Sequence, residues 1–217
     1  LAPVLDNFFA AVQDVANNPG SIPERQVLLS RGEELAGRFA YLDGRLNDFS
    51  REANVRVDDG VRQINNLATS LAELNDRIVL ASAGSSTPND LLDARDQVLN
   101  RLAEVVGVNT VEQADGAVNV FIGNGQSLVV GSNVTELVAF TDPADPTRLA
   151  VGVAGQSAPT DIGRFLSGGE LGAVLSVRGD LLDGARSQLG LIATGLVETV
   201  NEQQGLGLDL NGDIGTD

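Results

Sequence analysis

The stretch that decides the fold is VDDGVRQINNLATSLAELNDRIVLA, residues 57–81. Apolar or small residues recur in it at alternating steps of three and four. An α-helix brings residues with this spacing onto one face, so the stretch predicts a long helix with one buried side. The residues on that face are Val57, Gly60, Ile64, Leu67, Leu71, Leu74, Ile78 and Ala81.

The same alternation is already present further upstream. Between Ala53 and Val57 the step is four where three is due, and one such extra residue keeps a seven-residue pattern in phase with a straight helix. We therefore predict one continuous helix over residues 22–80, roughly 85–90 Å long at 1.5 Å per residue, in a rod-like molecule. The alternative is a break near Asp58, because Asp and Gly60 are poor helix formers. The upstream positions are Leu35, Phe39, Leu42, Leu46, Phe49 and Ala53.

Two shorter helices are predicted beside this one. Residues 3–17 form the first, and Ser21 then caps the long helix, with Glu24 three residues later as in a capping box. A further helix follows the loop ASAGSSTPND, which begins at residue 81, and ends near residue 105, with Thr87 as its cap and Pro88 at its first helical position. The predicted buried faces are Leu5, Phe8, Phe9, Val12 and Ala16 in the first helix, and Leu91, Val98, Leu102 and Val105 in the later one.

From Val108 the apolar pattern changes to a period of two, which is typical of strands. Asp115-Gly116 and Asn124-Gly125 are hairpin-turn pairs between β-prone runs. Strands are also predicted over residues 135–140 and 148–153. The side chains expected to face one way are Val118, Val120 and Ile122, followed by Leu128 and Val130.

Ser167 is predicted to cap another long helix with a matching apolar stripe. That stripe contains Leu171, Leu175, Leu182, Ala185, Leu189, Ile192, Leu196 and Val200. Arg178 occupies one place on it. Either its guanidinium reaches a carboxylate or helix-end carbonyls at the edge of the stripe, or it makes a specific polar link between the helices and the β unit.

These patterns predict an α+β fold, an elongated antiparallel bundle of long helices with a small inserted antiparallel β unit. Residues 1–107 and 155–205 would form a discontinuous helical bundle, and residues 108–154 the inserted β subdomain. Residues 206–217 would connect to a following domain. The start at Leu1 and the end in a polar loop favour an excised fragment.

The amino-acid composition excludes several classes of binding partner. Hydrophobic residues make up 42% of the chain and aromatic residues only 4%, so the core must be mostly aliphatic. The net charge of −16 repels nucleic-acid phosphates and anionic membrane surfaces, so neither is an expected partner. The same charge predicts that any assembly of copies is sensitive to salt.

The sequence lacks most of the residue types that enzymes use for catalysis. It contains no His, Cys or Lys, which removes the usual general bases and covalent nucleophiles. No cofactor is expected and we predict a protein that is not an enzyme. A carboxylate-dependent hydrolase is the enzymatic alternative. Asp90, Asp93 and Asp96 lie three residues apart near Arg95, which favours a solvated or inter-subunit face over a catalytic pair.

The acidic end of the chain raises a second alternative. Asp209, Asn211, Asp213 and Asp217 occupy the first, third, fifth and ninth places of an EF-hand-type calcium loop. Ile214 stands where that loop needs Gly, and the chain ends before the twelfth place. We therefore predict a turn-rich connector here, with a calcium-dependent binding or adhesive module as the alternative.

Several segments occur in an order that resembles a known family. They are INNLATSLAELNDRI, STPNDLLDARDQVLNRLAEVVGV, DGAVNVFIGNGQSLVVG, LSGGELGAVLSVR and GLDLNGDIGTD. In this order they are similar to the family of flagellar hook-associated protein 1, the hook–filament junction proteins. The resemblance covers essentially the whole chain. PNDLLDARD with the hairpin unit after it separates this family from flagellin and hook-type proteins, and Ala94, where the family often has Gln, is one departure.

The resemblance implies a structural, non-enzymatic role in the bacterial flagellum, outside the cell. Such proteins are exported unfolded through the flagellar type III apparatus. They contact the hook protein below and the second hook–filament junction protein above, and they associate with their own copies. Their terminal segments form the inner coiled-coil tube, and the C-terminal one binds an export chaperone. Both segments are expected to be missing from this fragment.

Overall fold

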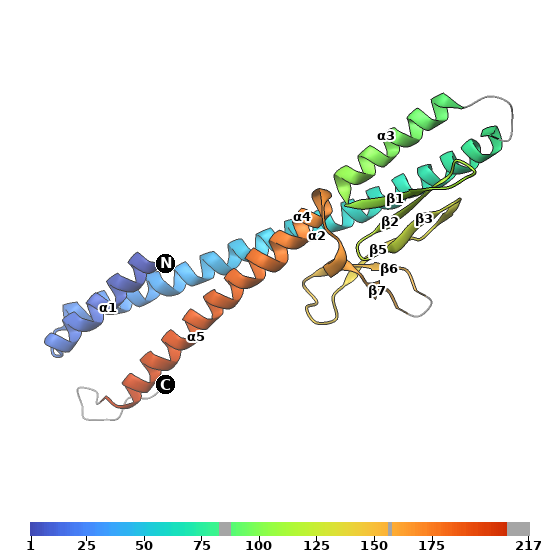
Figure 1. Cartoon of the computed structure of the whole chain (residues 1–217). Coiled ribbons are helices and arrows are strands. Elements are labelled where there is room, and N and C mark those ends of the chain that lie inside the picture. Colours follow the sequence, from blue (N-terminus) through green and yellow to red (C-terminus); the bar gives the residue numbers. More distant parts are fainter. Residues whose placement is uncertain (83–87, 156–157, 208–217) are drawn as a thin grey trace. The chain divides into compact units, whose positions relative to one another are not determined.

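The computed structural model describes residues 1–82, 88–155 and 158–207. It has an α+β fold, in which long helices are combined with two small antiparallel sheets (Figure 1). The predicted fold class is therefore confirmed. The helices are α1 (Ala2–Asn17), α2 (Ile22–Ser82), α3 (Asn89–Val105), the 3-10 helix η1 (Gly163–Phe165), α4 (Gly169–Val177), the π-helix η2 (Arg178–Leu182) and α5 (Asp183–Gly205).

Helix α2 runs for 61 residues without interruption, so the predicted continuity is confirmed and the alternative break near Asp58 is wrong. Its start is the predicted one: Ser21 Oγ accepts a hydrogen bond from the Glu24 backbone N–H at 3.5 Å. Glu24 Oε1 in turn accepts from Asn18 Nδ2 at 3.2 Å, which ties the preceding turn to the cap. The predicted cap Thr87 of α3 lies outside the described residues.

The chain divides into two compact units. The first comprises Leu1–Asp48 and Leu182–Asp217, and the second comprises Phe49–Leu181. Helix α2 contributes to both, and the strands share the second unit with α3 and α4. These borders differ from the predicted ones at residues 107 and 154, and the predicted division into domains stays a prediction.

In the second unit, only half of the predicted stripe on α2 is buried. Its seventh-residue positions Val57, Ile64, Leu71 and Ile78 are all fully buried. Gly60, Leu67, Leu74 and Ala81 are half-buried, and Val61, Ala68 and Asn75, each one residue after a predicted position, are buried instead. One aliphatic core joins this stripe to α3 and to the inner faces of both sheets. It includes Val57, Val61, Ile64, Ala68, Leu71, Leu102, Val105, Val118, Val120, Ile122, Leu128, Leu137, Val151, Ile162 and Leu171.

The sheets have the strand orders β1-β2-β3-β4 and β5-β6-β7, with all pairs antiparallel. Their turns contain Gly116 and Gly125 with φ of 90° and 97°, so both predicted hairpin turns are confirmed. The strands are β1 (Val108–Glu112), β2 (Val118–Ile122), β3 (Gln126–Val130), β4 (Asn133–Val134), β5 (Leu137–Thr141), β6 (Leu149–Val153) and β7 (Thr160–Asp161).

One predicted strand face is wrong. Val118, Val120 and Ile122 point inward as expected, but Val130 is exposed. The register between β2 and β3 shifts at Val120, so that two consecutive residues of β3, Leu128 and Val129, are buried. A bulge of this kind changes which side chains face the core, and a strict period of two cannot predict it.

The helix predicted to start at Ser167 is also corrected. Gly168, with φ of 70°, precedes α4 in place of a serine cap, and no side-chain cap bond forms. Gly169 has φ of 60° and lies so close to the Val105–Val106 backbone that a Cβ would overlap it. The predicted single helix is three segments, because the π-helix η2 separates α4 from α5.

In the first unit the predicted faces are only partly correct. On α1, Phe9, Val12 and Ala16 are exposed and Ala11 is buried, so the inward face lies toward Val4, Phe8, Ala11 and Val15. On α5, Ala185 and Ile192 are exposed, although the stripe predicts them buried. Phe49 of α2, at the start of the second unit, is exposed as well.

Candidate functional site

The described residues contain no cluster of three or more His, Cys, Asp or Glu side chains placed to hold a metal ion. The predicted calcium alternative at Asp209, Asn211, Asp213 and Asp217 lies outside these residues and stays a prediction. Within the same part of the chain, no helix has the length and apolar composition needed to cross a bilayer.

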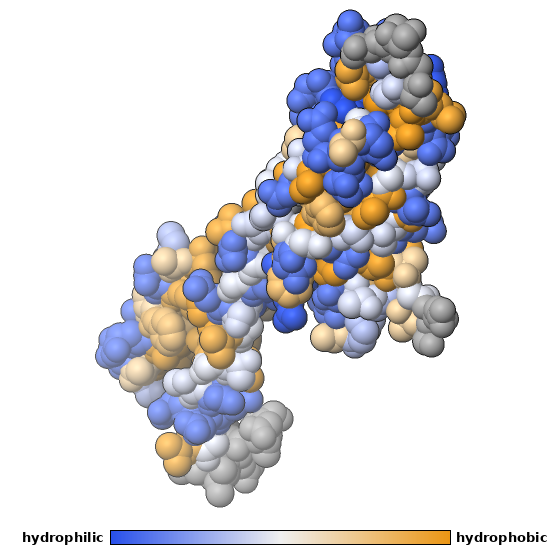
Figure 2. All heavy atoms as spheres, turned by 45° about the vertical axis from the view of Figure 1, so that its right-hand side comes forward, coloured by the Kyte–Doolittle hydropathy of each residue, from blue (hydrophilic) through white to orange (hydrophobic). Residues whose placement is uncertain are grey.

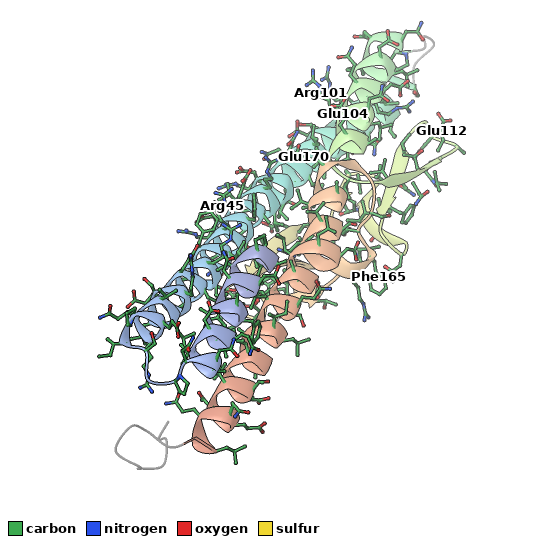
Figure 3. The ribbon with its side chains drawn as sticks, turned by 90° about the vertical axis from the view of Figure 1, so that its left-hand side faces the viewer. Arg45, Arg101, Glu104, Glu112, Phe165 and Glu170 are labelled. Carbon is green, nitrogen blue, oxygen red and sulfur yellow. The ribbon has the colours of Figure 1, made fainter. Side chains whose placement is uncertain are left out.

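The acidic side chains that could form a catalytic pair lie on the surface. Asp90, Asp93 and Asp96 are exposed on α3, and Asp96 Oδ1 accepts hydrogen bonds from Arg95 Nε and Nη2 at 3.2 and 3.1 Å. Figure 3 labels Glu104, Glu112 and Glu170, which come from α3, β1 and α4 and are all exposed. Their exposure fits a charged, solvated surface.

Two arginines that the sequence placed on helix faces are buried. Arg95 Nη1 donates to the Gly116 carbonyl at 3.2 Å and so holds the β1–β2 turn against α3. Arg178 is only 5% exposed, and its Nη1 donates to the Leu149 carbonyl of β6 at 2.7 Å. Of the two readings of Arg178, the polar link to the β region is confirmed. Nothing in the residue pattern indicates that Arg95 is buried, because a helical Arg beside three Asp is typical of a surface.

The exposed side of α2 carries ion pairs within the helix. Arg56 Nη2 lies 2.9 Å from Glu52 Oε1, and Arg62 Nη2 lies 2.8 Å from Asp58 Oδ2 and 2.7 Å from Asp59 Oδ1. The hydrogen bond to Glu52 raises the pKa of Arg56, and the one to Asp59 raises the pKa of Arg62. Both arginines are charged at any physiological pH, so these contacts supply no pH switch.

The first unit has an open apolar groove of about 830 Å³ between α1, α2 and α5. Several of its side chains are strongly exposed, with Phe9 at 49% and Leu29 at 70%. Figure 2 shows apolar side chains gathered at several places on the surface among hydrophilic ones. The groove is lined by Phe8, Phe9, Val12, Leu28, Leu29, Gly32, Glu33, Ala36, Thr199, Val200, Gln203, Gln204 and Gly207.

A surface of this kind suits contact with other proteins better than chemistry. Apolar side chains supply the free energy of burial, and charged faces around them restrict which partner and which orientation fit. Polar links such as Arg178 to Leu149 keep the surface-bearing elements in place.

Comparisons with known proteins agree with this reading. The family model for the flagellar hook-associated protein FlgK helical domain matches residues 1–217. Flagellar hook-associated protein 1 of Escherichia coli is 38% identical over the whole chain, and that of Salmonella typhimurium is 35% identical. The solved structure of the flagellar hook junction protein FlgK from Burkholderia pseudomallei has a TM-score of 0.90 and 34% identity over 99% of this chain.

These matches define the class as structural proteins of the bacterial flagellum. Within that class the chain belongs to the family of the flagellar hook-associated protein FlgK, whose helical domain it matches from end to end. The chain spans 40% of the length of the E. coli and Salmonella relatives and of the Burkholderia structure.

Proposed function

We propose that this chain is a structural part of the junction between flagellar hook and filament and acts by protein–protein packing, without catalysis. The observation that carries the proposal is the match of fold and sequence over the whole chain to the hook junction protein of B. pseudomallei. The exposed apolar side chains of α1, α2 and α5 support it, since a packing role needs such surfaces.

The partners follow from the same proposal. The full-length protein would contact the hook protein on one side, the second hook–filament junction protein on the other, and neighbouring copies of itself. It would reach the cell exterior through the flagellar type III apparatus, and a C-terminal segment beyond this chain would bind an export chaperone. The net charge of −16 requires that contacts between copies overcome repulsion, so we expect them to strengthen as salt screens it.

A domain exchange tests the role directly. The matching segment of E. coli flagellar hook-associated protein 1 is replaced by this chain, in cells that lack their own copy of that protein. The proposal predicts that filaments stay attached to hooks in electron micrographs and that the cells swim.

Two further measurements make a negative result informative. A matched chimera with Leu71→Asp places a charge in the aliphatic core, so it should not fold and its cells should shed filaments. The unmodified chimera must accumulate to the level of the native protein and resist limited proteolysis. If it does both and filaments are still shed, the proposed junction role is wrong for this chain.

The alternative function, a calcium-dependent binding module, can be tested separately. Calorimetric titration of the chain with millimolar Ca²⁺ should give no heat if residues 206–217 are a connector. A saturable heat that disappears when Asp209 and Asp213 are both replaced by Asn would support the calcium alternative.

A further inference from the structure

The side chains of three asparagines on α2 form hydrogen bonds with the backbone of strands. The side chain of Asn54 reaches the start of β6, that of Asn65 reaches β5, and that of Asn75 reaches β2. Each carboxamide uses both its oxygen and its nitrogen. It accepts from a strand N–H and donates to a C=O in that strand or just before it, as one residue of a neighbouring strand would.

Asn65 occupies a free sheet edge. β5 is an edge strand of its sheet and, among the described residues, pairs with β6 alone. Asn65 Oδ1 accepts from the Leu137 N–H at 3.0 Å and Asn65 Nδ2 donates to the Leu137 C=O at 2.8 Å. Leu137 itself is buried, so both backbone groups would otherwise be unpaired away from water.

Asn75 fills the place where β2 and β3 separate. The ladder between these strands reaches Val120 and Val129 and goes no further in that direction. Beyond it, Asn75 exchanges hydrogen bonds with Val118 at 3.0 and 2.9 Å and also donates to the Gly131 C=O at 2.8 Å. Asn75 is only 1% exposed, and these three bonds compensate for its burial.

Asn54 acts in the same way at the start of β6. It accepts from the Leu149 N–H at 2.9 Å and donates to the Thr147 C=O at 2.8 Å. β7 pairs with β6 at Gly152 and Val153, so within the described part of the chain Leu149 has no strand partner on that side. The carbonyl of Leu149 accepts a hydrogen bond from Arg178. Both backbone groups of Leu149 are therefore hydrogen-bonded to side chains of helices.

We infer that Asn54, Asn65 and Asn75 form an edge lock, which fixes where each sheet docks on α2 by pairing backbone groups that the described strands leave unpaired. At the edge strand β5 it also closes the edge to strands of other chains. The spacing of 11 and 10 residues separates the three asparagines by roughly 16 and 15 Å along the helix. A sheet shifted along α2 would leave its edge groups unpaired, whereas an apolar contact alone would tolerate the shift. Open edges of this kind pair readily with another chain.

The test compares two neighbouring asparagines in this same 217-residue chain. Asn65→Leu removes one part of the lock, and Asn66→Leu is the matched control, because Asn66 is exposed and its side chain makes no hydrogen bond to any strand that the structure describes. Hydrogen exchange followed by NMR reads the Leu137 amide, and light scattering over a concentration series reads self-association. We expect Asn65→Leu to lower the protection of the Leu137 amide about tenfold or more and to cause concentration-dependent association.

Asn65→Asp and Asn66→Asp form a second pair. The carboxylate at position 65 still accepts from the Leu137 N–H but faces its carbonyl without a donor. Chemical denaturation should therefore show a clear loss of stability for Asn65→Asp relative to Asn66→Asp. The edge lock is wrong if the position 65 and position 66 variants agree in amide protection, association and denaturation midpoint.

Discussion

The two compact units bury the same kind of sequence to very different extents. In residues 49–181 the apolar stripe of α2 meets two sheets, α3 and α4, and Val57, Ile64 and Leu71 are inaccessible to water. In the other unit, which contains the first half of α2 with α1 and α5, only Ala11 and Leu35 are buried among the described hydrophobic residues, each at 4% exposure.

The difference shows what an apolar stripe can and cannot predict. The alternation of three and four residues continues across the border at Asp48, and the helix continues with it. The burial changes because the second unit adds strands, whose side chains fill the space along the stripe, whereas the described residues of the first unit form helices without strands. Periodicity thus predicts the helix and its apolar side, and neighbouring elements decide how deeply that side is buried.

The largest effect should come from the core of the second unit. Leu71→Ala is expected to lower its free energy of unfolding by about 2–5 kcal/mol, because the substitution leaves a cavity among fully buried neighbours. Leu29→Ala, on the same helix at 70% exposure, should cost under ~0.5 kcal/mol. Urea denaturation followed by circular dichroism measures both, and equal losses would remove the contrast between the units.

A smaller effect is expected at the polar link of Arg178. Arg178→Met keeps much of the side-chain volume but leaves the Leu149 carbonyl without this donor, which should cost about 1–3 kcal/mol. Arg186→Met is the control in the other unit, where the exposed Nη2 donates to Asn47 Oδ1 at 2.7 Å, and it should cost about 0–1 kcal/mol. Urea midpoints of the two variants check this, and a larger loss for Arg186→Met would contradict it.

Much of the fold could be predicted from residue patterns, and the errors have physical causes. Helix α2, its Ser21 cap and both hairpin turns follow from local rules of spacing, capping and turn chemistry. The predicted burial of Val130 and the predicted inward face of α1 are wrong, because a bulge shifts β3 and tertiary contacts rotate α1. The period of the sequence contains neither effect.

The polar contacts were harder to predict than the apolar ones. Asn75 and Arg95 read as ordinary helix-surface residues, because their partners are backbone groups of strands far away in sequence. Backbone groups are the same at every residue, so no pattern of side chains marks them as partners. Arg178 differs from Asn75 and Arg95 because it interrupts an apolar stripe, and that interruption is visible in the sequence.

Replacing a glycine by alanine should change the stability in opposite directions in the two units. Gly169→Ala in the second unit is expected to destabilise by about 1–3 kcal/mol, since Gly169 has φ of 60° and its Cβ would overlap backbone. Gly190→Ala on α5 meets open space in a helix and should stabilise by roughly 0.5–1 kcal/mol. Thermal denaturation of the two variants gives the signs, and a shift of the midpoint in the same direction for both would contradict the difference in packing.

The smallest effect is expected on the exposed side of α2. Arg62→Ala removes contacts to Asp58 and Asp59, yet all three side chains are exposed, so the loss of stability should be the smallest of the series and shrink further in 1 M NaCl. Because the carboxylates raise the pKa of Arg62, the arginine stays charged and the contribution should not change between pH 6 and pH 9. Urea midpoints of both proteins at two salt concentrations and two pH values measure this. A loss as large as that of Leu71→Ala would show that charge on this face, rather than the aliphatic stripe, stabilises the second unit.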